Sequence, residues 1–232
     1  MMRYCTILIL MLLCGSGYAG DHNGGIGSVE ESPKPSNEVS LERSLWTEEI
    51  TSLHLLANNG SVTEQVKLGK MYYEGQGVAQ DFGKAFEWYE KAAEQGLVQA
   101  QYNLGLMYYQ GQGVAQDFGK AFEWYEKAAE QNYPEAQVKL GAMYYEGQGV
   151  AQNFGKAVEW YERAAEQGLV HAQYNLGVMY ENGQGVAQDF FNAFEWYEKA
   201  AEQGLVQAEY NLGVMYYEGQ GVAKDFVKAF EW

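Results

Sequence analysis

Apolar residues recur at helical spacing along most of the chain. In the segment 98–110 they lie on one face of a predicted helix: Ala100, Leu104, Met107 and Tyr108. In the segment 118–130 they form a second stripe: Phe118, Ala121, Phe122, Tyr125, Ala128 and Ala129. Gly111 favours a left-handed C-cap after the first segment, and Asp117 is typical of an N-cap before the second. The pattern predicts two helices joined by a turn.

The same pattern returns every 36 residues. The glycine that opens the turn recurs in five places: Gly75, Gly111, Gly147, Gly183 and Gly219. The units run over 62–97, 98–133, 134–169, 170–205 and 206–232, and the last of them is incomplete. One helix pair cannot bury its own apolar stripe, so successive units must stack. The sequence therefore predicts an all-α array of about five 36-residue helix-turn-helix repeats.

The glycine-rich turn does not read as a phosphate loop. In "GQGVAQDFGKA", which begins at Gly75, Gln80 stands where a dinucleotide fingerprint has its third glycine. Five residues separate Gly77 from Gly83, one more than a P-loop has, and Ala85 follows the lysine instead of Ser or Thr. A structural turn is the better interpretation.

The segment before the repeats has three parts. Residues 1–19 place one arginine before a short apolar run and end in a small residue, which is typical of a signal peptide cleaved after Ala19. Residues 20–40 are a flexible spacer rich in Gly, Ser, Pro and Glu, and 41–61 form a degenerate N-terminal capping helix. We expect an exported protein, periplasmic or secreted, with no transmembrane segment in the mature chain.

Charge and composition limit the classes of partner and the kinds of site to be expected. The formal net charge is −16, which disfavours nucleic acid and favours basic or neutral partners. Cys5 and Cys14 both lie in the predicted signal peptide, so no disulfide is expected in the mature protein. The three histidines lack metal-ligand spacing, and we expect no metal, no cofactor and no catalytic residue. Lys120, Glu123, Lys127 and Glu130 follow one another along a solvated stripe, here called the helix-B edge, on which opposite charges meet.

The repeated motif is specific enough to suggest a family. The pattern "A-x3-LG-x2-Y-x2-GxGV-x2-D-x2-KA-x2-WY-x-KAA-x2-G" covers residues 62–232 and resembles the Sel1-like repeat, a relative of the tetratricopeptide repeat. The resemblance implies a right-handed α-solenoid that binds proteins or peptides and usually has no catalysis of its own. It favours an exported scaffold or adaptor.

Two alternatives stay open. Cysteine-rich members of that family have been associated with β-lactams, which suggests a cell-envelope enzyme or enzyme accessory acting on peptidoglycan or β-lactams. The repeats contain neither serine nor cysteine, which counts against such a nucleophile. A lumenal adaptor of eukaryotic protein quality control is the third possibility, since a signal peptide does not reveal its compartment.

The resemblance also selects a binding surface. In related helical repeats the exposed residues of the first helix line a concave groove. By position, the partner-binding candidates here are Tyr73, Glu74, Tyr102, Tyr109, Gln110, Tyr145, Glu146, Tyr174, Asn182, Tyr210, Tyr217 and Glu218. Tyrosines beside glutamates would suit an extended, basic, partly apolar peptide. The incomplete last unit leaves a short apolar stripe, through which we expect fraying or self-association.

Overall fold

The computed structural model describes residues 48–232, and within that range every regular element is a helix. The predicted signal peptide, the spacer and the first residues of the capping segment lie outside the described residues. Residues 48–58 are helical, within the segment where a capping helix was expected. In the part of the chain that the structure describes, no helix is long and apolar enough to cross a membrane.

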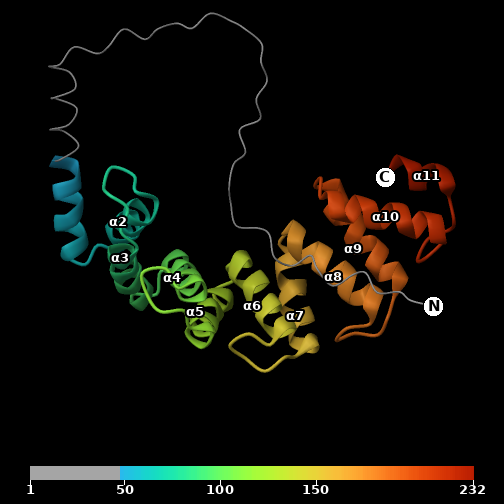
Figure 1. Ribbon diagram of the computed structural model, residues 1–232, viewed down its shortest axis with the longest axis horizontal. Coiled ribbons are helices and arrows are strands. Elements are labelled where there is room, and N and C mark those ends of the chain that lie inside the picture. Colours follow the sequence, from blue (N-terminus) through green and yellow to red (C-terminus); the bar gives the residue numbers. More distant parts are fainter. Residues whose placement is uncertain (1–47) are drawn as a thin grey trace, which may run out of the picture. The chain divides into compact units, whose positions relative to one another are not determined.

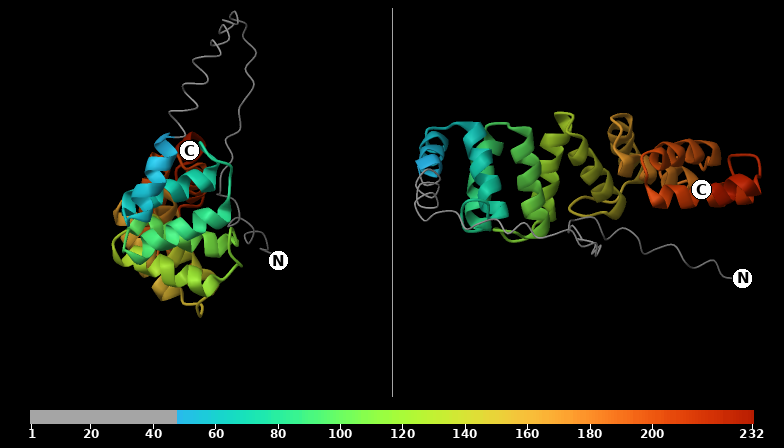
Figure 2. Two further views of the ribbon diagram at one scale, coloured as in Figure 1. Left: turned by 90° about the vertical axis from the view of Figure 1, so that its left-hand side faces the viewer. Right: turned by 90° about the horizontal axis from the view of Figure 1, so that it is seen from above.

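Each repeat contributes two helices, here called helix A and helix B. The A helices are α2 (Val62–Glu74), α4 (Val98–Gln110), α6 (Pro134–Glu146), α8 (Val170–Asn182) and α10 (Val206–Glu218). The B helices are α3 (Phe82–Glu94), α5 (Phe118–Glu130), α7 (Phe154–Glu166), α9 (Phe190–Glu202) and the short α11 (Phe226–Glu231). Each helix packs against the helices before and after it in the chain (Figure 1), and successive repeats follow one another as a stack (Figure 2).

The helix ends follow the sequence prediction. The Asp117 carboxylate accepts a hydrogen bond of 3.0 Å from the Lys120 backbone N–H, and Gly111 closes α4 with φ +69°. Asn132 is the one non-glycine residue with positive φ (+61°) in the described range, and Pro134 opens α6. The two-helix prediction is confirmed at each of these positions.

Small residues let helices A and B of one repeat approach closely. A Cβ added to Gly105 on α4 would lie 2.8 Å from the Tyr125 ring of α5, and that ring is fully buried. Gly69, Gly141 and Gly177 meet Tyr89, Tyr161 and Tyr197 in the same way. The Leu-Gly pair of the motif therefore serves the packing of a buried tyrosine.

The G-Q-G turn joins one repeat to the one before it. Gly113 has φ +72°, and a Cβ added there would lie 2.2 Å from the Phe82 carbonyl oxygen at the start of α3. Gly149, Gly185 and Gly221 make the equivalent approach to Phe118, Phe154 and Phe190. The turn thus needs glycine twice over, for its backbone conformation and for contact with the preceding helix B.

A buried glutamine, not anticipated from the sequence, ties three helices together. The Gln131 Nε2 group donates to Gln101 Oε1 over 2.7 Å, and Gln101 Nε2 donates to the Ala93 carbonyl over 3.4 Å. The same pair of bonds recurs at Gln65, Gln137 and Gln173, all buried. Each of these glutamines bonds to the C-terminal ends of the helices before and after its own helix A.

The helix-B edge is exposed as expected, but its cations contact rings. Lys127 Nζ lies 3.7 Å from the centre of the Trp124 ring, and Lys120 Nζ lies 5.2 Å from the centre of the Tyr108 ring. Corresponding cation–ring pairs occur in the neighbouring repeats. The expected meeting of lysine with glutamate thus gives way to stacking, because a lysine stem on the helix can cover the adjacent aromatic ring.

Candidate functional site

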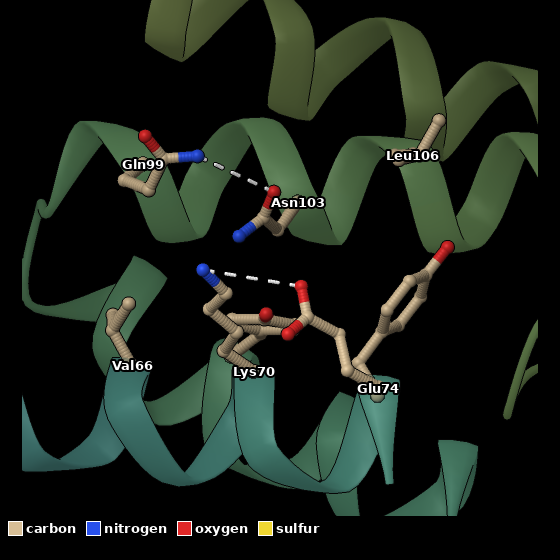
Figure 3. A pocket seen from close by; sticks show the side chains of 8 residues that line it. Val66, Lys70, Glu74, Gln99, Asn103 and Leu106 are labelled. Carbon is tan, nitrogen blue, oxygen red and sulfur yellow. Dashed lines mark hydrogen bonds and ion pairs between the residues drawn. The ribbon is translucent and has the colours of Figure 1, made fainter. Parts of the chain in front are cut away.

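The exposed side of the A helices, here called the helix-A surface, carries a pocket between the first two repeats. The pocket measures about 470 Å³ and lies between α2 and α4. Its lining residues are Val66, Lys70, Tyr73, Glu74, Tyr89, Gln99, Asn103 and Leu106 (Figure 3). Two candidates from the sequence, Tyr73 and Glu74, are among them.

The pocket combines apolar ends with a polar centre. Lys70 Nζ lies 3.9 Å from Glu74 Oε1 on α2, and Gln99 Nε2 donates to Asn103 Oδ1 over 3.5 Å on α4 (Figure 3). Val66 and Leu106 are half-buried hydrophobic residues of the two facing helices. Amide, charged and apolar groups in one pocket suit a segment of polypeptide, which offers backbone amides together with side chains.

Buried tyrosines lie beneath the helix-A surface. Tyr89, Tyr161 and Tyr197 are at most 3% exposed, and their hydroxyls interact with Asn103, Asn175 and Asn211 respectively. Burial, followed by the charges of nearby glutamates, raises the pKa of each of these tyrosines well above its usual value. These groups stay protonated and belong to the scaffold.

We expect the protein to lose stability steeply at high pH. The pKa of the Tyr161 hydroxyl is raised above its ordinary value of 10.0, so the folded state keeps a proton that the unfolded chain releases above pH 10. Stability from this source is complete below pH 10 and falls as the pH rises above it. Tyr161→Phe should flatten the dependence measured in urea melts above pH 10. An unchanged slope in this variant would contradict the assignment.

Three of the candidate tyrosines lie between repeats. The hydroxyl of Tyr109 donates to Gln148 Oε1 of the next G-Q-G turn over 2.8 Å, and its ring packs edge-on against Phe118. Tyr73 and Tyr145 make the same bonds, to Gln112 over 2.7 Å and to Gln184 over 3.1 Å. These side chains are half-buried, so each one both joins two repeats and shows part of its ring on the surface.

The other candidate tyrosines differ in exposure. Tyr102 packs against Tyr125 and Tyr133, and Tyr174 packs against Tyr197; both are half-buried. Tyr210 and Tyr217 on α10 are 70% and 60% exposed. Their counterparts in earlier repeats are half-buried against the following repeat.

The polar candidates fall into two groups. Glu146 and Glu218 are exposed, and partial burial raises the pKa of the Glu146 carboxyl. Gln110 accepts a hydrogen bond from Tyr73, whereas Asn182 donates to the Val178 carbonyl of its own helix. The two glutamates therefore present their carboxylates to solvent, whereas the amides of Gln110 and Asn182 bond to other groups of the protein.

The tyrosine–glutamine link was missed by sequence reasoning. Tyr73, Tyr109 and Tyr145 are predicted from their position on helix A, whereas the sequence pattern assigns no role to the glutamine between the turn glycines. The available signal was a constant offset of 39 residues between each tyrosine and its partner. The partner-binding role of these tyrosines stays a prediction.

Among residues 48–232 no group of three or more His, Cys, Asp or Glu side chains is placed to hold a metal ion.

A family model described as Sel1 repeat matches residues 65–97, 98–133, 134–169, 170–205 and 206–232. Comparison with curated proteins found no match.

Two solved structures share the fold and much of the sequence. One is a protective antigen of uropathogenic Escherichia coli strains that displays an SLR fold, with a TM-score of 0.77 and 42% identity; the match covers 78% of this chain and 39% of that one. The other is a Sel1 repeat protein from Oxalobacter formigenes, with a TM-score of 0.77 and 36% identity, covering 84% and 80%. The solenoid of helix-turn-helix repeats is thereby confirmed.

Proposed function

The chain belongs to the Sel1 repeat family, and from that premise we propose that it is a non-catalytic scaffold that binds a protein or extended peptide along the helix-A surface. Proteins built of these repeats are typically protein-interaction scaffolds. The single observation that carries the proposal is the pocket between α2 and α4, in which apolar, amide and charged side chains of two repeats converge.

The variation of residues between repeats supports the same surface. The buried position beneath the surface is tyrosine in four repeats: Tyr89, Tyr125, Tyr161 and Tyr197. The central position of helix A instead changes in each of the first four repeats: Lys70, Leu106, Ala142 and Val178. A buried tyrosine that stays constant, beneath a helix-A position that varies from repeat to repeat, fits a scaffold that presents different contacts along one ligand.

The partner that suits this surface is basic or neutral. The chain carries a net charge of −16, and glutamates at 74, 146 and 218 add negative potential beside the tyrosines. We also propose that the protein is exported, periplasmic or secreted. The E. coli relative is a protective antigen, which supports a location accessible to the immune system.

Charges placed on the helix-A surface should weaken partner binding. The partner would first be recovered with the tagged protein from its source, and its affinity for purified variants then measured by calorimetry. Leu106→Glu combined with Val178→Glu puts two carboxylates on half-buried apolar positions, and we expect affinity to fall at least about tenfold.

The matched control has the same net charge. Lys120→Gln combined with Lys199→Gln also makes the protein two units more negative, but both changes lie on helix B. We expect these substitutions to change affinity by less than about twofold. Circular dichroism melts of both double variants establish that the fold is retained. Equal losses in the two variants would show that net charge, and not this surface, governs binding.

A further inference from the structure

The fourth repeat breaks the series of inter-repeat tyrosines. The position held by Tyr73, Tyr109 and Tyr145 in the first three repeats is Glu181 in the fourth. Glu181 does not reach forward to the next turn as the tyrosines do; its Oε2 accepts a hydrogen bond of 2.6 Å from the buried Tyr197 hydroxyl. Gln220, the counterpart of Gln112, therefore receives no tyrosine hydroxyl.

The surroundings of the missing ring are otherwise preserved. A Cβ added to Gly221 would lie 2.1 Å from the Phe190 carbonyl oxygen, compared with 2.2 Å for Gly113 and Phe82. The turn that carries Gln220 is thus seated on its preceding helix B as in the other repeats. In the first repeat the Tyr73 ring lies between the Phe82 ring, 5.3 Å away centre to centre, and Gln112. No tyrosine ring takes that place between Phe190 and Gln220.

The charge of this junction differs from that of the first pocket. The eight residues that correspond to the lining of the first pocket are Tyr174, Val178, Glu181, Asn182, Tyr197, Gln207, Asn211 and Val214. The set contains one carboxylate and no lysine or arginine, whereas the first pocket pairs Lys70 with Glu74. Lys224, in the turn that follows, lies over the Tyr217 and Phe226 rings. The half-buried Glu181 carboxylate thus has no lysine or arginine among the other residues of this set.

We propose that this junction, between α8 and the turn after α10, binds an arginine side chain of the partner. The inference rests on the proposed function and deepens it. The aliphatic stem would cover the Phe190 ring, as the tyrosine ring does elsewhere. The planar guanidinium would donate to the Glu181 carboxylate and to the Gln220 amide oxygen, which a point-like ammonium serves less well. The half-buried Tyr174, whose ring packs 5.7 Å from that of the buried Tyr197, adds aromatic surface on the same side.

The test uses a model compound, because the partner is unidentified. Nα-acetyl-arginine methylamide and its neutral isostere Nα-acetyl-citrulline methylamide are titrated into the purified protein and followed by amide NMR shifts. We expect saturable shifts at the side-chain amides of Gln220 and Asn211 with the arginine compound. The citrulline compound should bind at least about fivefold more weakly.

Two substitutions separate the site from general attraction to an acidic protein. Glu181→Gln should weaken binding of the arginine compound at least about fivefold, while Glu123→Gln removes the same charge on the exposed helix-B edge and should have less than about twofold effect. Glu181→Tyr should restore the link to Gln220, abolish binding and raise the melting temperature. Equal effects of Glu181→Gln and Glu123→Gln, or equal binding of the two compounds, would overturn the proposal.

These outcomes are distinct from those of the scaffold proposal. Loss of partner binding on charging positions 106 and 178, without specific binding of the arginine compound, would leave the scaffold standing and remove the arginine site. Specific binding of the arginine compound at Gln220, with normal partner binding in the variant charged at positions 106 and 178, would leave the arginine site standing and remove the scaffold proposal.

Discussion

Replacing Gly113 with alanine should destabilise the protein by about 4 kcal/mol, which is near the upper end of what single substitutions do. The residue has φ +72°, and the new Cβ would lie 2.2 Å from the Phe82 carbonyl oxygen, an atom of helix backbone that cannot move aside cheaply. Relief requires the second repeat to shift away from the first. The free energy of unfolding from urea melts measures the effect.

Gly96 provides the matched control. It also has a positive φ, +86°, but a Cβ added there would meet nothing within 4 Å. Gly96→Ala should therefore cost only the backbone strain, about 1 kcal/mol. The difference between the two variants isolates the contact between repeats. Similar losses in both would mean that the turn glycines serve backbone conformation alone.

The pair Tyr109→Ala and Tyr145→Ala should lower both stability and partner affinity. The rings pack against Phe118 and Phe154, and the hydroxyls bond to the next turn, so we expect the free energy of unfolding to fall by about 3 kcal/mol. Partner binding, measured below the onset of melting, should weaken by about 2 kcal/mol or more, because part of each ring is exposed. Helix content at low temperature should be retained.

The corresponding phenylalanine pair separates the two contributions. Tyr109→Phe and Tyr145→Phe remove the bonds to Gln148 and Gln184 but keep the rings, so stability should fall by about 2 kcal/mol while partner affinity is largely kept. Normal affinity in the alanine pair would refute a binding role for these tyrosines. An unchanged free energy of unfolding in the alanine pair would refute the role of these tyrosines between repeats.

The repeat architecture could be predicted because its signals are local. A fixed period, a glycine after each helix A and an N-cap before each helix B determine the two helices and their turn, and Asn132 in place of glycine follows the same rule. The buried stripe of α4 likewise follows from helical spacing alone.

The links between repeats could not be predicted in the same way. Gln101 reads as a polar surface residue, and its burial depends on the ends of two other helices that happen to present a carbonyl and an amide to it. The direction of the Tyr109 side chain depends on the stacking of the next repeat, which sequence spacing does not give. The 36-residue period places Glu181 at the position of Tyr145, but its hydrogen bond to Tyr197, which leaves Gln220 without a tyrosine partner, depends on side-chain directions that the period does not give.

Crosslinking from single positions tests the central claim most directly. A photoreactive benzoylphenylalanine is placed either at position 106, on the helix-A surface, or at position 123, on the helix-B edge. The scaffold proposal predicts that the co-purified partner is captured from position 106 and not from position 123. Capture from position 123 alone would contradict a binding site on the helix-A surface.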